Sequence, residues 1–255
     1  MAYQVLLLHG NGGASARFGP LLDRLADHAD LRPVIPALSG FEGRPLPATG
    51  DHWSHFMQEL GQAIDLPQAD WVLYGHGIGG SLLMEWAARG YPLPNGEHLR
   101  PRRVILHSVI GASLGQRWFP KLMKPLWVRE TMQHLIATPA LQALWEGRLF
   151  QHPQRIPADL RRQFFADYAR CAAFPVFFDL ITVDWYQALL PRIQQVPFYF
   201  LWGQRERVVQ AKYLRLWRRD FPHATFEVLP GWDHFPMLDQ PDEFADKLRA
   251  LVIDH

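Results

Sequence analysis

The sequence holds a single cysteine, Cys171, so the chain cannot close a disulfide within itself. Scarce cysteine is typical of proteins from reducing compartments, and we therefore expect a cytoplasmic location. Alanines and Phe174 follow Cys171 along the chain, which favours a buried packing thiol over a reactive nucleophile.

An excess of charge of either sign is also missing, because the formal net charge is only +1. Without a strong field, we expect neither nucleic acid nor an anionic membrane as a partner. Local groups such as Arg100, Arg102 and Arg103 are typical of solvated faces in a neutral chain. No apolar run is long enough to span a bilayer, and no basic segment precedes the short apolar run at residues 5–8. The sequence therefore predicts neither a membrane span nor a signal peptide.

What the sequence does hold is a glycine-dense turn between an expected strand and an expected helix. Residues 71–74 form a short apolar run, and Leu82, Leu83 and Trp86 recur at helical spacing after it. The residues between them, 75–80, read Gly-His-Gly-Ile-Gly-Gly. Strand, sharp turn and helix form the context of a nucleophile elbow, whose usual pattern is G-x-S-x-G. Here Gly77 stands where the serine would be, and glycine has no nucleophilic atom.

Strands and helices are expected to alternate along most of the chain. We predict strands at residues 4–8, 32–35, 71–74, 104–107, 198–202 and 225–229. We predict helices at residues 17–28, 51–64, 212–221 and 241–253, besides the one that follows the elbow. This alternation implies right-handed crossovers, and hence the α/β class with a doubly wound, mostly parallel sheet.

The strand pattern stops between residues 111 and 190. Aromatic-rich helical segments replace it at residues 118–136, 139–150, 158–171 and 174–190. A segment of this length is too long for a loop inside a compact domain. We predict a helical cap at residues 111–190, inserted into a core of residues 1–110 and 191–255 and lying over the carboxyl ends of the strands.

Eight aromatic side chains of the cap are candidates to line a pocket, although most of them are expected to pack the cap on the core. They are Trp118, Trp127, Trp145, Phe164, Phe165, Tyr168, Phe177 and Phe178.

Three further segments complete a pattern with the elbow. Residues 9–13 read His-Gly-Asn-Gly-Gly, residues 202–209 read Trp-Gly-Gln-Arg-Glu-Arg-Val-Val, and residues 230–237 read Pro-Gly-Trp-Asp-His-Phe-Pro-Met. Taken in order, the four motifs resemble the α/β-hydrolase superfamily over nearly the whole chain. They look most like its capped bacterial esterases and acyl hydrolases of the menaquinone- and biotin-pathway type. One departure is that the chain opens at the first parallel strand, without the short antiparallel strands that many relatives carry before it.

The resemblance implies roles for particular residues. His234 looks like the general base and Glu206 like the acid that orients it, in the order that this fold uses. The backbone N–H groups of Asn11 and Ile78 would form the oxyanion hole, and Gly77 would occupy the nucleophile position. The same resemblance implies no metal and no cofactor.

Neither neighbour of the elbow is expected to replace the missing serine. Ser81 lies one turn down the helix and should point away from the tip of the turn. His76 flanks the tip, but in relatives this position faces the protein interior and not the substrate.

Four interpretations remain open at this stage. The first is an enzyme that acts on a small apolar ester, acyl or ring compound with a His–Glu base and no serine. The second is a catalytically inactive ligand-binding protein, since the N-myc-downstream-regulated proteins also carry glycine at the elbow. The third is a serine esterase inactivated by substitution of Gly77. The fourth is a dinucleotide-binding protein, because Gly75, Gly77 and Gly80 match its glycine fingerprint.

The fourth interpretation lacks one required feature. A dinucleotide site needs an acidic residue about 20 positions after the glycines to hold the ribose. The corresponding region here, residues 99–103, holds arginines instead. The substrate and the oligomeric state stay open on the sequence alone.

Overall fold

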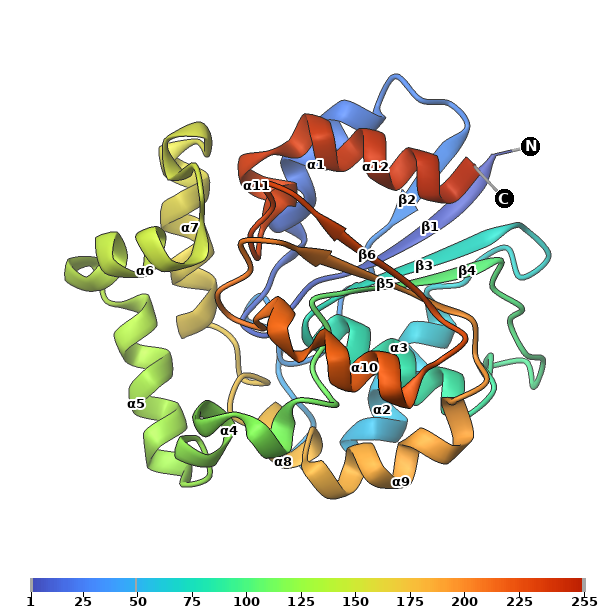
Figure 1. Cartoon of the computed structure of the whole chain (residues 1–255), viewed down its shortest axis with the longest axis horizontal. Helices are drawn as coiled ribbons and strands as arrows, with labels where there is room; N and C mark the ends of the chain where they lie inside the picture. The colour runs from blue at the N-terminus through green and yellow to red at the C-terminus, as the bar shows by residue number, and fades with distance from the viewer. Residues whose placement is uncertain (1, 49, 254–255) are drawn as a thin grey trace.

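A computed structural model describes residues 2–48 and 50–253 of the chain. Its centre is one sheet of six strands in the order β2-β1-β3-β4-β5-β6, and all neighbouring strands run parallel (Figure 1). The strands are β1 (Tyr3–Leu8), β2 (Leu31–Val34), β3 (Trp71–His76), β4 (Arg103–His107), β5 (Phe198–Gly203) and β6 (Thr225–Leu229). The α/β class and the parallel, doubly wound sheet predicted from the sequence are thereby confirmed.

Helices cover both faces of this sheet. α1 (Gly19–Leu25), α11 (Pro236–Asp239) and α12 (Pro241–Ile253) lie on one face, the upper one in Figure 1. α2 (His52–Gln62), α3 (Ile78–Ala88), α9 (Val183–Ile193) and α10 (Leu214–Asp220) lie on the other face. The central strands are buried on both sides, which is why they read as continuous apolar runs and not as alternating ones.

After β1 the chain crosses to one face of the sheet, and after β3 it crosses to the opposite face. These two strands pair with each other in the middle of the sheet, with Leu7 opposite Tyr74. α1, which follows β1, and α3, which follows β3, lie on opposite faces (Figure 1). Such a switch point opens a crevice at the carboxyl ends of the strands, where ligands of α/β sheets bind.

The remaining helices lie beyond these carboxyl ends, at the left and lower left of Figure 1. They are α4 (Trp118–Leu122), α5 (Leu126–Ala137), α6 (Gln142–Leu149), α7 (Ala158–Ala169) and α8 (Phe177–Leu180). Among the described residues, no strand occurs between β4 and β5. The division of the chain into a core and a mobile cap stays a prediction.

Several predicted helices are shorter or divided in the structure. The helix expected at residues 118–136 breaks before Pro125, because a residue that precedes proline is disfavoured in helical conformation. The helix expected at residues 174–190 divides where Thr182 caps α9 by accepting a hydrogen bond from the N–H of Trp185. Near the N-terminus, a 3₁₀ turn, η1 (Ser15–Phe18), precedes α1, and Pro20 sits in the first turn of α1, where proline is tolerated.

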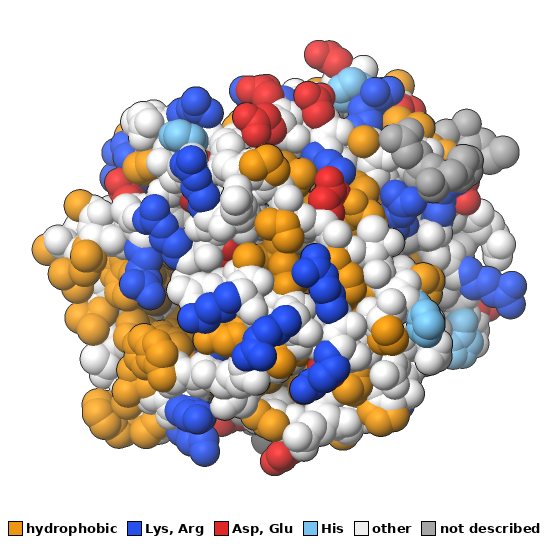
Figure 2. All heavy atoms as spheres, in the orientation of Figure 1, with side chains coloured by type: hydrophobic (Ala, Val, Ile, Leu, Met, Phe, Trp, Pro, Cys, Tyr) orange, Lys and Arg blue, Asp and Glu red, His pale blue; other side chains and the backbone are white. Residues whose placement is uncertain are grey.

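Large hydrophobic side chains gather on the outside of the region that holds α4 to α6, at the left of Figure 2. The exposed ones in these helices are Trp118, Leu122, Leu126, Trp127, Leu135 and Leu144. Among residues 2–48 and 50–253, no helix combines the length and the apolar character needed to cross a bilayer.

Candidate active site

Gly77 lies where β3 meets α3, with a φ of 55° and a ψ of −117°. Glycine adopts this conformation freely, whereas any other residue is strained in it. A Cβ at Gly75 would lie 2.5 Å from the amide nitrogen of Gly80, and one at Gly79 would lie 2.7 Å from backbone oxygens at the end of β1. Those two glycines are therefore required by close packing. A Cβ at Gly77, in contrast, would meet only the Cα of Gly10, at 3.6 Å, among the atoms that the structure describes.

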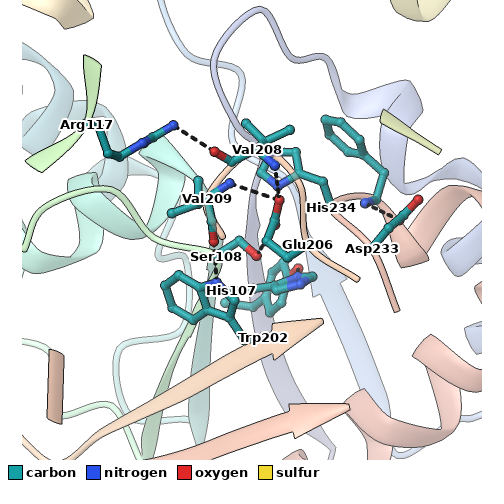
Figure 3. Close-up of polar contacts among 11 residues, drawn as sticks. His107, Ser108, Arg117, Trp202, Glu206, Val208, Val209, Asp233 and His234 are labelled. Atoms are coloured by element: carbon teal, nitrogen blue, oxygen red, sulfur yellow. Dashed lines mark hydrogen bonds and ion pairs between the residues drawn. The ribbon is translucent and has the colours of Figure 1, made fainter. Parts of the chain in front are cut away.

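The loops after β5 and β6 bring Glu206 and His234 together (Figure 3). The Nδ1 of His234 lies 2.6 Å from the Oε2 of Glu206, and both side chains are buried. A carboxylate at Nδ1 favours the tautomer in which Nδ1–H donates and Nε2 is the basic nitrogen. His234 and Gly77 line the same cavity. The two residues assigned as base and acid from the sequence thus lie within hydrogen-bonding distance.

Three further donors hold the carboxylate of Glu206. The Ser108 hydroxyl donates to Oε2 at 2.6 Å, and the N–H groups of Val208 and Val209 donate to Oε1 at 2.6 and 2.9 Å. Burial by itself would raise the pKa of Glu206, but the charge of His234 and the hydrogen bonds together lower it to about 2. Glu206 therefore stays ionised at neutral pH and can stabilise a protonated His234.

Ser108 is a residue of this site that no sequence motif marks. It follows β4 directly and has a φ of 46°, which is uncommon for a residue other than glycine. Its backbone N–H donates to the carbonyl of Leu201 at 3.0 Å, which fixes it between two strands. Strained residues gather at functional sites, but only the structure reveals this one.

The two residues expected to form the oxyanion hole face the same cavity as His234. Asn11 follows β1, and Ile78 is the first residue of α3. The side chain of Asn11 is engaged elsewhere, since its Nδ2 donates to the carbonyl of Phe174 at 3.1 Å and its Oδ1 accepts from the N–H of Gly12 at 3.0 Å. This fixes the loop and leaves the backbone of Asn11 as the group that can serve the cavity.

Two more histidines pack behind His234. The ring of His76 lies 4.5 Å from the ring of His234 and 5.1 Å from that of His107. His107 also shares a hydrogen bond of 2.6 Å between its Nδ1 and the Tyr74 hydroxyl. Burial lowers the pKa of His76 well below its usual value and that of His107 to about 3, so both are neutral. The ring of His76 is buried in the protein interior and also lines the cavity. This corrects the expectation that His76 faces the interior only.

Ser81 points away from the tip of the elbow. Its hydroxyl is buried and donates to the carbonyl of Ile110 at 2.8 Å. Within the part of the chain that the structure describes, no group of three or more histidine, cysteine or acidic side chains could hold a metal ion.

The cavity above Gly77 has a volume of about 280 Å³. Five of the eight predicted aromatic residues line it, namely Trp118, Trp145, Tyr168, Phe177 and Phe178. Phe164 and Phe165 are buried in aromatic packing outside the lining, and Trp127 is 68% exposed on the outer surface. Helical spacing alone does not separate the inner face of a cap helix from an outer face that is also apolar.

Comparisons with known proteins give one consistent result. A model described as the alpha/beta hydrolase family matches residues 5–247. Lipase 1 of Psychrobacter immobilis is 22% identical over 255 residues, which cover 97% of this chain and 76% of the lipase.

Two solved structures resemble the whole chain. An esterase from Exiguobacterium antarcticum superposes with a TM-score of 0.71 at 17% identity, covering 98% of this chain and 92% of the esterase. A 2-hydroxy-6-oxo-6-phenylhexa-2,4-dienoate hydrolase from Rhodococcus sp. superposes with a TM-score of 0.73 at 18% identity, covering 100% of this chain and 91% of that enzyme. At such identities these structures show the fold alone.

Proposed function

The chain belongs to the alpha/beta hydrolase family, and on that premise we propose that it is a hydrolase without a covalent nucleophile. In this proposal His234, oriented by Glu206, activates a water molecule directly, and the water attacks a small apolar ester, acyl or ring compound. The cavity above Gly77 would hold both molecules. A reducing location, the cytoplasm, remains part of the proposal because the chain has one cysteine.

The proposed reaction has two steps. The Nε2 of His234 takes a proton from water as the water oxygen bonds to the substrate carbonyl carbon, and the carbonyl oxygen becomes an oxyanion. The backbone N–H groups of Asn11 and Ile78 stabilise that oxyanion. The oxyanion then collapses, the bond to the leaving group breaks, and the imidazolium returns its proton to the leaving oxygen. Glu206 stays ionised throughout and stabilises the imidazolium.

One observation carries this proposal above the others. The distance of 2.6 Å between the Nδ1 of His234 and the Oε2 of Glu206 is that of an oriented base. His234 lines the same cavity as Gly77, and the space above Gly77 is open, since a Cβ there would meet only Gly10 among the described atoms. A water molecule can occupy the volume that a serine side chain would fill.

A second candidate is a ligand-binding protein that carries out no reaction. The absence of a nucleophilic atom at Gly77 favours it, as does the largely apolar lining of the cavity. In that case the His234–Glu206 pair would be a structural hydrogen bond.

Turnover of short p-nitrophenyl esters distinguishes the two candidates. For the enzyme, we expect His234→Ala and Glu206→Gln to lower kcat at least about a hundredfold and to change ligand affinity less than about tenfold. The exposed His223→Ala is the matched control and should keep full activity. Folded wild-type protein with no turnover of any ester, and unchanged ligand binding in all three variants, would establish the binding protein instead.

The same experiment includes a test for a covalent intermediate. Wild-type protein should not react with a fluorophosphonate, and no acylated protein should accumulate in mass spectra during turnover. Labelling of Ser81 or Ser108 would show that another residue acts as the nucleophile, and the direct-water mechanism would be wrong.

A further inference from the structure

Arg17 lies in the wall of the cavity that holds His234. It belongs to η1, directly after the loop that carries Asn11, and its side chain is only 3% exposed. Charged residues are rarely buried to this extent unless they are paired. Arg17 and His234 both line the cavity, and the phenyl ring of Phe235 is a neighbour of each.

Most of the guanidinium group of Arg17 has no hydrogen-bond partner. Its Nη2 donates to the carbonyl of Gly12 at 2.6 Å, whereas Nε and Nη1 are buried without an acceptor among the described residues. The guanidinium carbon lies 4.1 Å from the ring centre of Phe164, 5.2 Å from that of Tyr168 and 5.4 Å from that of Phe235. Aromatic faces attract the charge, but they leave the N–H groups of Nε and Nη1 unsatisfied.

The acidic residues near Arg17 contact other groups, although the Oδ2 of Asp167 is buried without a hydrogen-bond partner among the described residues. Glu42 accepts hydrogen bonds from the N–H and the hydroxyl of Ser15, at 3.1 and 2.7 Å. Asp167 pairs with Arg170 at 2.5 Å through Oδ1. Burial raises the pKa of Asp167, and the charges of Arg170 and Arg17 offset this only in part. Within the described part of the chain, no carboxylate therefore contacts the buried guanidinium of Arg17. An unpaired buried charge lowers the stability of a fold unless an anion binds to it.

We propose that Arg17 forms an anion subsite of this cavity and that its ligand is a small apolar molecule bearing one carboxylate. The free Nη1–H of the guanidinium would donate to one oxygen of the carboxylate, while the aromatic wall binds the apolar part. Because Nη1 is buried in the free protein, the neighbouring rings would shift as the carboxylate enters. Combined with the proposed function, the substrate is an ester or acyl compound that carries a free carboxylate away from the reacting carbonyl. The subsite itself is independent of turnover, because it concerns binding.

The test compares two ligands of the same shape, hydrocinnamate and hydrocinnamyl alcohol, by calorimetry at a pH where the acid is ionised. We expect the wild-type protein to bind the carboxylate at least about tenfold more tightly than the alcohol. Arg17→Met keeps the length and apolar packing of the side chain and should abolish this preference, with the alcohol bound as before. Arg148→Met removes an exposed arginine at the rim of the same cavity and should keep the preference.

Equal affinity of the wild-type protein for the two ligands would overturn the proposal, and so would a preference that survives in Arg17→Met. Should Arg17→Met fail to fold, a crystal structure of the wild-type protein with hydrocinnamate decides. The carboxylate should lie within about 3 Å of Nη1, and any other position contradicts the subsite. His234→Ala should keep the preference, so a failure of the hydrolase proposal would be seen separately.

Discussion

The elbow keeps its sharp backbone turn at Gly77, although glycine cannot perform the chemistry of the serine usually found there. With a φ of 55°, any side chain at this position costs about 1–3 kcal/mol. The backbone nevertheless keeps the sharp turn, because Gly75 and Gly79 have no room for a Cβ and hold strand and helix close together. Replacement of serine by glycine thus relieves strain without changing the path of the chain.

Gly77→Ser should therefore install a nucleophile beside His234. The added Cβ meets only the Cα of Gly10 at 3.6 Å among the described atoms, so strain and not collision sets the cost. We expect hydrolysis of short p-nitrophenyl esters through an acylated serine, reaction with a fluorophosphonate, and a loss of about 1 kcal/mol in the free energy of unfolding. Gly77→Ala, which carries the same strain and no hydroxyl, should lose similar stability and stay unlabelled. A folded serine variant that neither turns over nor reacts would show that the surrounding frame is not catalytic.

Asp233 should make stability depend on pH. Burial and the neighbouring charge of Asp239 raise its pKa to about 7, and its Oδ2 has no hydrogen-bond partner in the described part of the chain. Between about pH 4 and pH 7 the carboxyl of Asp233 keeps its proton in the folded state and has lost it in the unfolded state. The protonated carboxyl therefore stabilises the fold fully below about pH 4, and this stabilisation is lost as the pH rises through 7.

Asp233→Asn should remove this dependence. Urea unfolding at pH 8 should show a gain of about 2 kcal/mol in the free energy of unfolding, with little change at pH 4. The exposed Asp65→Asn should change neither value. Parallel pH profiles of the wild-type protein and Asp233→Asn would mean that Asp233 is charged in the fold.

Individual site residues differ in how far the sequence predicts them. His234 and Glu206 stand in motifs that follow strands, so the sequence alone is enough to propose their roles. Ser108 and Arg17 stand in no motif, and their contacts join segments far apart in the chain: Ser108 reaches Glu206 across 98 residues. Long-range contacts of this kind depend on the strand order, which local patterns do not determine.

Among the elements, three of the helices beyond the strand ends, α4, α5 and α8, are joined by Arg129 of α5. Its Nε donates to the carbonyl of Met123 at 2.5 Å, and its Nη1 and Nη2 bind both oxygens of Asp179 in α8 at 2.5 and 2.6 Å. Two more carbonyls, those of Lys124 and Pro175, accept from the same guanidinium. One buried side chain thus joins α4, α5 and α8 at the points where the expected long helices are interrupted.

Arg129→Lys should loosen this region, because a single ammonium cannot replace the planar fork of five bonds. We expect hydrogen exchange of α4, α5 and α8 to speed up about tenfold or more, while β1 and β3 keep the protection of the wild-type protein. The exposed Arg162→Lys on α7 should have no effect. If exchange rises equally in the strands, the helices and the sheet unfold as one unit, and the prediction of a separate cap is wrong.

For the whole molecule, the reaction of its single cysteine with a thiol reagent reports when the fold opens. Cys171 is fully buried where α7 ends, and burial raises the pKa of its thiol to about 11. At pH 8 the folded protein should hardly react with a thiol reagent, because the thiolate is scarce and inaccessible.

Urea should expose Cys171 in steps if the cap opens first. We expect thiol labelling to begin at lower urea than the loss of hydrogen-exchange protection in β1 and β3 that reports global unfolding, with a weaker dependence on urea. Coincident transitions would instead describe a single cooperative domain.

The overall architecture is the part that the sequence predicts best. Apolar runs followed by glycine turns mark the buried strands, and their alternation with helices implies a parallel sheet. Helix ends within the cap are predicted poorly, because prolines and capping residues such as Thr182 decide them one by one. The apolar outer face of α4 to α6 misleads any prediction of the pocket, since Trp127 faces outward although it is as hydrophobic as Trp145.

The absence of a side chain at Gly77 affects the order in which the products of the reaction are formed and released. A serine enzyme stores the acyl group on the protein, releases the alcohol first and then lets any nucleophile, water or another alcohol, compete for the stored group. Gly77 offers no place for such storage. In the proposed mechanism both products are therefore formed within one occupancy of the cavity. Progress curves should rise without a burst, and the two products should appear at equal rates from the first turnover.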